Sequence, residues 1–539
     1  MKSKQQKEFG DYQTPQSFAN TVCLYLWDYL NVSPNIIIEP TCGIGTFLNA
    51  CSHFFDSKFM FGLEINEKYL QKAQKLSTNT NIYWLHADIF HFDLNYFSSF
   101  LQQNDHILLI GNPPWVNNSN LSSWNSENIP LKNNEKKLKG FDALTGSSNF
   151  DICESIILKL IRHFQKKTTT LAMLCKTNVA HKIFREMVQN NWPFHEFRII
   201  NFKAAKIFQV ATEACLLIVQ WKAQSENGKK TIQFNVPEHF SLIDPFNDSS
   251  VDSSDFSSRL DTSRNFGEVF DWNNRCLSKF GFKNSTFYSN LNDHIIDLSG
   301  KCCFEWRQGI KHDCASILEL SKKNEVFENK INELVDIEEA CIYPLIKSRD
   351  FKNYIINKTN HFVIVTQKKI QDDLSIQNET LPRTWQYLIQ HKNWFSKRKS
   401  SIYKNRPLFS LFGIGDYSFS KCKVGISGFY KKPRFSLIYS SKPFMLDDTC
   451  YSISLDSYEI GYAVMLLLNS SIVQQFLKSL TLISAKRPFT KRILQQIDIN
   501  KCLDYLKFDD LKQTECELKL PSFFCSDHYD QFARMISNQ

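Results

Sequence analysis

The sequence has no long apolar run and no paired metal-ligand pattern. None of its hydrophobic stretches reaches the roughly 18 residues of a membrane-spanning helix, and its first ten residues, MKSKQQKEFG, contain no apolar core of a signal peptide. Its 16 cysteines form no CxxC pair and no cluster with histidine at zinc spacing. We therefore expect a cytoplasmic protein with reduced thiols, no disulfide, no bound metal and no membrane partner.

The composition instead favours well-packed domains. Of the 539 residues, 42% are hydrophobic and 45 are phenylalanine. This apolar content excludes global disorder. At roughly 150 residues per domain, the chain has room for two to four domains.

Basic residues are concentrated late in the chain. The formal net charge is +9, and residues 351–500 contain 22 Lys and Arg but only 9 Asp and Glu. Aromatic residues are interleaved with the basic ones, namely Trp394, Tyr403, Phe412, Phe429 and Tyr430. This combination predicts a surface that binds a polyanion, and the alternative is a set of solvated lysine-rich faces.

Short apolar strands alternate with amphipathic helices over the first 225 residues. Strand-like segments include 59–65, 106–112 and 214–221, whereas residues 151–164 have helical spacing. The alternation predicts an α/β fold with a mostly parallel sheet and helices on both faces.

The pattern changes after residue 225. Residues 245–265 are rich in Ser and Asp, so we expect residues 226–300 to form a linker or a surface excursion. Residues 301–539 contain short strands and few long helices, apart from 458–480, and predict a separate mixed α+β domain.

A strand, a glycine turn and a helix are predicted for EPTCGIGTF, residues 39–47. Gly43 and Gly45 permit positive φ angles and a close approach of backbone amides to a ligand. Glu64 closes the next strand about 20 residues later, where a carboxylate can bind both hydroxyls of a ribose. Asp88 closes the third strand, where it can accept a hydrogen bond from an adenine amino group.

In this order, the motifs resemble the S-adenosylmethionine-dependent methyltransferases, in which the acidic loop after the first strand faces the methionine end of the cofactor. The turn lacks the third glycine of a dinucleotide fingerprint, which disfavours NAD. The resemblance implies S-adenosylmethionine as cofactor and a Rossmann-like catalytic domain over residues 1–225. The implied cofactor-binding residues are Glu39, Pro40, Thr41, Gly43, Gly45, Glu64, Ile65, Asp88 and Ile89.

A second motif, GNPPW (111–115), follows an apolar strand. Pro113 and Pro114 restrict the backbone, so that the Asn112 side chain and the Pro113 carbonyl are free to face a pocket as acceptors. Two acceptors on the hydrogens of a planar exocyclic amine favour a pyramidal nitrogen, which can attack a sulfonium methyl group. Trp115 offers a face on which a base can stack.

This second motif, placed after the cofactor pattern, resembles that of the amino-methyltransferases. The flanking segments resemble the gamma-class adenine-N6 DNA methyltransferases of type II restriction-modification systems. FGDYQTP (9–15) matches the segment before the glycine turn, where Thr14 and Pro15 line the methionine end of the cofactor. Phe208 matches the aromatic residue on the other face of the extruded base. The implied catalytic residues are Asn112, Pro113, Pro114, Trp115 and Phe208, and Asn112 also lies at the cofactor.

The same resemblance implies a DNA target-recognition domain over residues 301–539, in which WRQGIKHDC (306–314) and YPLIKSRDF (343–351) look like typical segments. The implied activity is methyl transfer to N6 of an adenine flipped out of double-stranded DNA, without a covalent enzyme intermediate. The methylation would protect host DNA from a cognate restriction endonuclease, which is a functional partner. We expect a monomer.

Other interpretations stay open at this stage. A fused restriction-modification enzyme needs a nuclease site, and the nearest match is Asp509 or Asp510 with the ELK triplet at 517–519. An RNA or protein amino-methyltransferase can use the same NPP loop, and a DNA-binding module can keep the fold without the chemistry. Trp115 also occurs in cytosine-N4 enzymes, although Asn112 favours adenine. The sequence does not reveal the DNA recognition site.

Overall fold

A computed structural model describes residues 12–77, 79–116, 151–210, 212–223, 266–283, 286–291, 295–324, 326–369, 380–403, 406–481 and 487–538. The chain forms two compact units, Met1–Lys283 and Asn284–Gln539.

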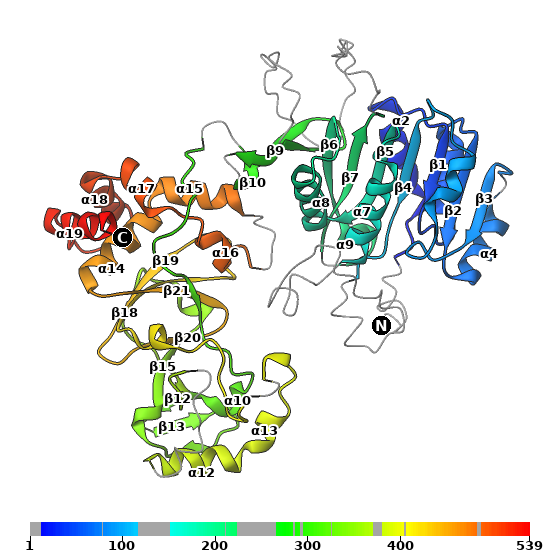
Figure 1. The fold of residues 1–539 in the computed structure, drawn as a ribbon. Helices are drawn as coiled ribbons and strands as arrows, with labels where there is room; N and C mark the ends of the chain where they lie inside the picture. The colour runs from blue at the N-terminus through cyan, green and yellow to red at the C-terminus, as the bar shows by residue number, and fades with distance from the viewer. Residues whose placement is uncertain are drawn as a thin grey trace. The chain divides into compact units, whose positions relative to one another are not determined.

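The first unit is built on one sheet, in which the strands follow the order β9-β8-β6-β7-β5-β4-β1-β2-β3 (Figure 1). The strands are β1 Ile36–Glu39, β2 Phe59–Glu64, β3 Ile82–His86, β4 Ile107–Gly111, β5 Thr169–Lys176, β6 Glu196–Lys203, β7 Glu213–Trp221, β8 Phe266–Phe270 and β9 Cys276–Lys283. The helices are α2 Gln16–Asp28, α3 Thr46–Phe54, α4 Glu67–Leu76, α7 Ile152–Phe164, α8 Thr177–Gln189 and α9 Ala204–Ile207, with a 3-10 turn η1 Leu94–Ser99.

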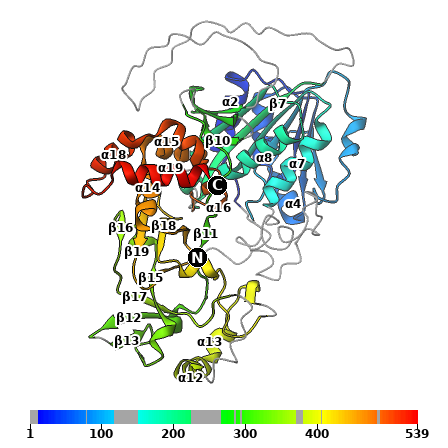
Figure 2. The ribbon, with the colours of Figure 1, turned by 60° about the vertical axis from the view of Figure 1, so that its left-hand side comes forward.

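Helices cover both faces of this sheet, as the alternating pattern predicts. Strands β3, β2, β1, β4 and β5 pair in parallel. Their central members β1 and β4 are buried throughout and apolar apart from Glu39, because neither face of a covered parallel sheet meets water. Helices α7 and α8 contact each other and β5, whereas α2 contacts α3, which lies against β1 and β2. Figure 2 shows α7 and α8 on one face and α2 on the other.

The order of the parallel strands reverses beside β1. Strand β1 pairs with β2 on one side and with β4 on the other, although β3 separates β2 from β4 along the chain. In open α/β sheets, ligands bind at the carboxyl ends of the strands at such a reversal. Both sequence motifs lie there, because β1 ends at Glu39 and β4 ends at Gly111.

Two features of the sheet differ from the expected pattern. Strand β7 is antiparallel to both β5 and β6, and its apolar sequence does not encode that direction. Strands β8 and β9 extend the sheet, with β8 parallel to β6 and β9 antiparallel to β8. The prediction of a linker is therefore wrong for residues 266–283, which are part of the first unit. The Ser/Asp-rich segment 245–265 lies outside the described residues.

The second unit is a mixed α+β structure with two sheets, in the orders β11-β21-β18-β19-β16 and β14-β13-β12-β17-β15-β20. The strands of these sheets are β11 Arg307–Gln308, β12 Glu319–Lys323, β13 Val326–Asn329, β14 Leu334–Val335, β15 Ile342–Ile346, β16 Ile355–Ile356, β17 His361–Ile364, β18 Cys422–Ser427, β19 Phe435–Tyr439, β20 Met445–Leu446 and β21 Cys450–Leu455. The unit also contains β10 Thr286–Leu291, which belongs to neither of the two sheets. The helices are α10 Ala315–Leu318, α12 Pro382–Gln390, α13 Lys392–Ser396, α14 Tyr458–Asn469, α15 Ser471–Leu480, α16 Lys491–Leu494, α17 Ile499–Tyr505, α18 Phe508–Glu517 and α19 Ser526–Ser537.

Each sheet of the second unit has its own hydrophobic core. Helix α14 packs on β18, β19 and β21 and is covered by α15, α18 and α19. The other core lies between the second sheet and the helices α12 and α13. Across the described residues no single helix is long and apolar enough to span a membrane; only α14 and α15 taken together, bent by 60°, have the length and composition.

Candidate active site

The glycine turn joins β1 to α3 in a conformation that requires glycine. Gly43 and Gly45 have φ angles of 54° and 79°, and Gly45 is the N-cap residue directly before α3. A Cβ atom on Gly45 would lie 2.5 Å from a ring carbon of Trp84, and one on Gly43 would lie 2.9 Å from Gln13 Oε1. Both glycines therefore serve the backbone geometry and the close packing of the turn.

Glu64, at the end of β2, holds this turn. Its Oε2 accepts a hydrogen bond from the Gly43 amide and its Oε1 accepts one from the Asn66 amide, each at 2.8 Å. Glu64 is buried, whereas the neighbouring Ile65 is 54% exposed. The expected contact of Glu64 with a ribose stays a prediction, and the carboxylate here organises the loop on which a cofactor would bind.

Glu39 is a buried carboxylate at the end of β1. Burial raises its pKa well above the ordinary range; a backbone hydrogen bond from Leu48 opposes the rise, and nearby Cys23 and Glu64 add to it. Its Oε2 has no hydrogen-bond partner in the described part of the chain, and neither does the buried Thr41 Oγ1. A cationic amine in this position would supply the missing donors, because a buried charged group needs a partner.

The loop after β3 is held in place by Lys159 of α7. Asp88 Oδ1 accepts from the Phe90 amide at 2.9 Å, and Ile89 is buried. The Lys159 ammonium donates to the carbonyls of Ile89, Phe90 and Phe92 at 2.7, 3.0 and 3.0 Å. The role of Lys159 was not predicted from the sequence, in which its one signal is that a lysine occurs in a helix whose buried positions are mostly apolar.

The NPPW motif begins beside the end of β1. A Cβ atom on Gly111, which precedes the motif, would lie 3.4 Å from Glu39 Cγ. The Asn112 amide nitrogen Nδ2 donates to the Tyr12 carbonyl at 3.0 Å and to Thr14 Oγ1 at 3.3 Å. Asn112 Oδ1 is buried and has no hydrogen-bond partner in the described part of the chain. The structure thus leaves a buried acceptor directly after β4.

Thr14, which contacts the Asn112 side chain, and Pro15 lie directly before α2. The Pro15 carbonyl accepts from the amides of Phe18 and Ala19 at 3.0 and 3.1 Å, so Pro15 is the N-cap residue of α2. Thr14 is buried and contacts Asn112. The segment that precedes the glycine turn in sequence therefore packs against NPPW in space, although the two lie about one hundred residues apart.

Trp115 and Phe208 are buried in a cluster of aromatic rings. Their ring centroids are 5.4 Å apart and their planes meet at 76°, an edge-to-face contact. The Tyr12 ring lies 6.1 Å from Trp115 and 6.4 Å from Phe208, and the Trp115 indole nitrogen donates to the Leu174 carbonyl at 3.2 Å. Rings at this angle do not face each other, so the expected sandwich of a base between them requires one ring to turn. That sandwich stays a prediction.

The acidic residues of the nuclease alternative lie on helix α18 or at its end. Asp510 Oδ2 accepts from the Lys507 amide at 2.7 Å and caps the helix, and Glu517 Oε1 accepts from Gln513 Nε2 at 2.8 Å. These contacts explain the two side chains as helix-stabilising groups. Within the described residues, no group of three or more His, Cys, Asp or Glu side chains is placed to hold a metal ion.

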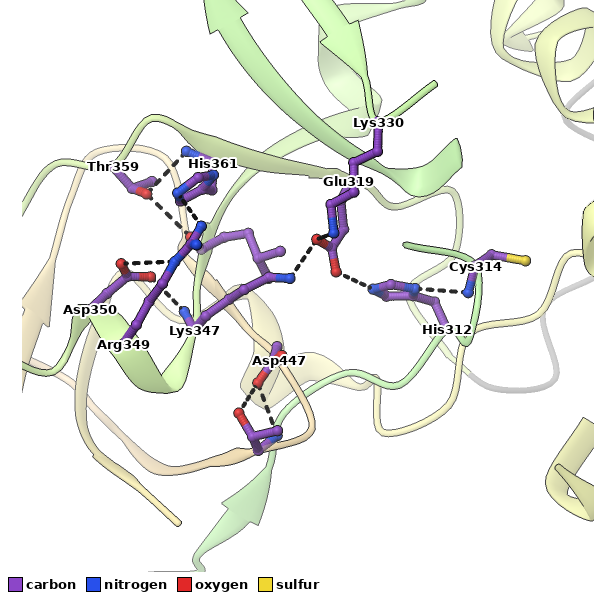
Figure 3. A network of polar contacts seen from close by, with 12 residues as sticks. His312, Cys314, Glu319, Lys330, Lys347, Arg349, Asp350, Thr359, His361 and Asp447 are labelled. Carbon is purple, nitrogen blue, oxygen red and sulfur yellow. Dashed lines mark hydrogen bonds and ion pairs between the residues drawn. The ribbon is translucent and has the colours of Figure 1, made fainter. Parts of the chain in front are cut away.

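In the second unit, the segments 306–314 and 343–351 meet at a buried carboxylate. Figure 3 shows Glu319 between His312 and two lysines, Lys330 and Lys347. His312 Nδ1 accepts from the Cys314 amide at 3.2 Å, and Nε2 lies 3.4 Å from Glu319 Oε1, so the ring proton is placed on Nε2. Burial raises the pKa of Glu319, but hydrogen bonds from His312, Lys330 and Lys347 outweigh this and hold the pKa below the ordinary value.

The fold and this arrangement define the class. A parallel sheet that reverses beside β1, a glycine turn at the reversal and, among the described residues, an acceptor without a partner after β4 form the catalytic unit of an S-adenosylmethionine-dependent methyltransferase. The chain is 38% identical over 504 residues to the Type II methyltransferase M.NspV of Nostoc sp., an alignment that covers 92% of this chain and 97% of the relative. It therefore belongs to the type II methyltransferases of restriction-modification systems, and its cofactor is S-adenosylmethionine, as the resemblance implied.

Two further likenesses are weaker. The chain is 27% identical over 115 residues to the Type II methyltransferase M.CvrRI of Paramecium bursaria Chlorella virus XZ-6E, which covers 21% of this chain and 27% of that relative. The solved structure of the Type IIL restriction-modification enzyme MmeI in complex with DNA has a similar fold, with a TM-score of 0.56 at 11% identity, covering 100% of this chain and 76% of MmeI. No protein-family model matches the chain.

Proposed function

We propose that the chain is a site-specific DNA methyltransferase of the gamma class, which transfers a methyl group from S-adenosylmethionine to N6 of a flipped-out adenine. The observation that carries the proposal is the buried Asn112 Oδ1, an acceptor without a partner in the described part of the chain, which follows Gly111 beside the end of β1. An acceptor in this place binds an N–H donor, and an exocyclic amine of a base is such a donor.

The residues at the carboxyl edge of the sheet divide into two groups. Those proposed to hold the cofactor are Thr14, Pro15, Glu39, Pro40, Thr41, Gly43, Gly45, Glu64, Ile65, Asp88, Ile89 and Asn112. The buried Glu39 carboxylate fits the ammonium group at the methionine end, because it lacks a donor. When bound, the cofactor supplies an electrophilic methyl group on a sulfonium.

The residues proposed to act on the base are Asn112, Pro113, Pro114, Trp115 and Phe208. The Asn112 side chain and the Pro113 carbonyl accept the two N6 hydrogens and localise the nitrogen lone pair for attack, and Pro114 holds the backbone in place. Trp115 and Phe208 contact the base once their present edge contact opens. After transfer, the cationic nitrogen loses its proton to water, and no covalent enzyme intermediate forms.

Double-stranded DNA is the proposed substrate, and the second unit is proposed to recognise its sequence. Residues 351–500 hold 22 basic and 9 acidic residues. The second unit also contains a cavity of about 560 Å³ lined by Gly300, Lys301, Lys491, Arg492, Gln495 and Gln496. MmeI was solved in complex with DNA, which supports the same partner for this chain. A target inside a duplex must be rotated out, at a cost of a few kcal/mol.

The biological role follows from the family. A type II methyltransferase marks host DNA so that a cognate restriction endonuclease does not cut it; we infer that this chain acts in the cytoplasm as a monomer. Adenine is favoured over cytosine because the motif begins with Asn112 rather than Ser.

The direct test is transfer of a labelled methyl group to varied duplex DNA, followed by nucleoside analysis. We expect N6-methyladenine, and a loss of at least about 100-fold in rate for Asn112→Ala, since electrostatic stabilisation of a reacting group is worth that much. Labelled N4-methylcytosine would correct the base, and no labelled base would refute the proposal. Long-read sequencing of DNA from cells that express the protein would then give the recognition site.

A further inference from the structure

The side-chain amide of Asn112 is held through its nitrogen. Nδ2 lies 3.0 Å from the Tyr12 carbonyl and 3.3 Å from Thr14 Oγ1. The oxygen at the other end is buried and without a partner in the described part of the chain. Two acceptors of the protein therefore hold the nitrogen, and the oxygen is left for something else.

The Tyr12 carbonyl decides which end of the amide faces it. A backbone carbonyl only accepts, whereas an asparagine amide has a donor end and an acceptor end of nearly the same shape. If the amide were reversed, its oxygen would face the Tyr12 carbonyl, and two N–H groups would occupy the position of Oδ1. Such a site would suit a carbonyl oxygen of a base and would repel an amine.

Tyr12 is itself anchored by its side chain. Its ring lies 6.1 Å from Trp115 at 44° and 6.4 Å from Phe208 at 61°. These contacts hold the backbone on which the carbonyl lies. The aromatic cluster and the orientation of Asn112 are thus linked through one residue.

We propose that Tyr12 and Thr14 are positioning residues that orient the Asn112 amide with Oδ1 as the acceptor for the target amine. This gives Thr14 a task besides the expected contact with the methionine end of the cofactor. The inference rests on the proposed function, because it assumes that Asn112 accepts from an amine. The pocket then selects groups that donate, such as an exocyclic amine, over carbonyl oxygens.

The proposal distinguishes asparagine from aspartate at position 112. A carboxylate has two equivalent oxygens, so it needs no orientation to present an acceptor. The Thr14 hydroxyl should therefore matter for methyl transfer when residue 112 is asparagine and matter little when it is aspartate. A role of Thr14 in packing or in cofactor binding alone would not depend on residue 112 in this way.

The experiment is a double-mutant cycle with Thr14→Val and Asn112→Asp, with Thr14→Ser as the conservative variant. Single-turnover transfer rates are measured at saturating DNA and cofactor, and the cofactor Kd is measured separately. We expect Thr14→Val to slow transfer about five- to ten-fold, the worth of one hydrogen bond, with the cofactor Kd within about two-fold. Thr14→Ser restores most of the rate, and in the Asn112→Asp protein Thr14→Val costs less than about two-fold.

The matched control is Thr21→Val, because the Thr21 hydroxyl donates to the Ser17 carbonyl within α2. If Thr14→Val lowered the transfer rate equally in the wild-type and Asn112→Asp proteins, the proposal would be overturned. A Thr14→Val protein with weaker cofactor binding and an unchanged transfer rate would also overturn it. If Asn112→Asp transfers methyl groups too slowly to measure, Thr14→Val and Thr14→Ser are compared in the Asn112 protein. A slower transfer rate in Thr14→Val but not in Thr14→Ser, at an equal cofactor Kd, would support the proposal, and equal rates would contradict it.

A second measurement does not depend on activity. The protein is labelled with ¹⁵N-asparagine for NMR. The side-chain amide signal of Asn112 is assigned as the signal that is absent from the spectrum of Asn112→Asp. We expect its hydrogen exchange to be slow in the wild type and faster in Thr14→Val. Unchanged hydrogen exchange in Thr14→Val would overturn the positioning role. A wild-type protein that methylates no DNA would instead refute the proposed function, and the exchange measurement would still show whether Thr14 holds the Asn112 amide.

Discussion

The carboxylate of Glu64 accepts a hydrogen bond from the amide of Gly43 at 2.8 Å and ties the end of β2 to the turn after β1. Its other oxygen accepts from the Asn66 amide at the same distance. One buried side chain therefore fixes the two loops proposed to carry the cofactor, so a change at Glu64 should affect both cofactor binding and folding.

We expect Glu64→Gln to weaken S-adenosylmethionine binding about ten-fold and to lower the free energy of unfolding by about 1–2 kcal/mol. The new amide nitrogen would face a backbone N–H, which is a contact between two donors. Calorimetric titration and urea unfolding measure the two effects. Glu67→Gln, at an exposed position of α4, is the control. Equal cofactor affinity in the two variants would contradict the prediction.

The stability of the cofactor-free protein should depend on pH through Glu39. Burial raises the pKa of Glu39 above its ordinary value of 4.5, so the folded state holds this proton more tightly than the unfolded state. Stability therefore falls as the pH rises from 4.5 toward the raised pKa. Glu39→Gln removes this loss, so in urea unfolding the free energy of unfolding of the variant should rise relative to that of the wild type as the pH increases above 4.5. It should also bind the cofactor less tightly. A difference between the two proteins that is independent of pH would contradict the prediction.

The buried ion network of the second unit should contribute strongly to its stability. Glu319→Gln removes the buried anionic partner of Lys347, and removing one member of a buried pair costs about 3–5 kcal/mol. Because the pKa of Glu319 is lowered, the wild-type contribution is complete above pH 4.5 and is lost as the pH falls below that value. Asp336→Asn is the control, because its pair with Arg383 is exposed and worth less than about 1 kcal/mol. Denaturant unfolding compares the two variants, and equal losses would contradict this assignment.

The basic cavity of the second unit should contribute to DNA affinity through phosphates. Replacing Lys301, Lys491 and Arg492 by Ala should reduce the slope of log K against log salt by about 0.9 for each phosphate that is no longer neutralised. Lys491 also lies 3.4 Å from Glu305, so its own contribution should be the smallest. Fluorescence anisotropy at several salt concentrations measures the slope. Lys68→Ala and Lys72→Ala in α4 are the controls. If the salt slopes of the cavity variants equalled those of the control variants, the DNA would not contact the cavity.

Much of the catalytic unit could be predicted from the sequence because its signals are local. The alternation of apolar strands and amphipathic helices gives the parallel sheet, and the strand ends place Glu39, Glu64 and Asn112 at one edge. The direction of β7 could not be predicted, because an apolar strand buried on both faces has the same pattern in either direction. Strands β8 and β9 were missed because they follow a polar segment and mix apolar with polar residues.

Side-chain partners were harder to predict than elements. Lys159 contacts three carbonyls of a loop that lies about seventy residues earlier, and Tyr12 contributes a backbone carbonyl, which no residue type encodes. The second unit shows the same limit. His312 and Lys347 lie in segments that resemble DNA-recognition sequences, and the structure shows both bonded to the buried Glu319, where they support the fold.

If Trp115 and Phe208 contact the target base as proposed, their present edge contact affects the free energy of base binding. A base that enters between the rings must break the contact between Trp115 and Phe208. The free energy of binding is therefore the stacking energy of the base with the rings minus the energy of the ring–ring contact. A base that stacks poorly gains less energy than the ring–ring contact provides, so it should dissociate and the two rings should contact each other again. In the proposed function, the contact between the two rings would therefore lower the affinity for every base and leave bound only those that stack well.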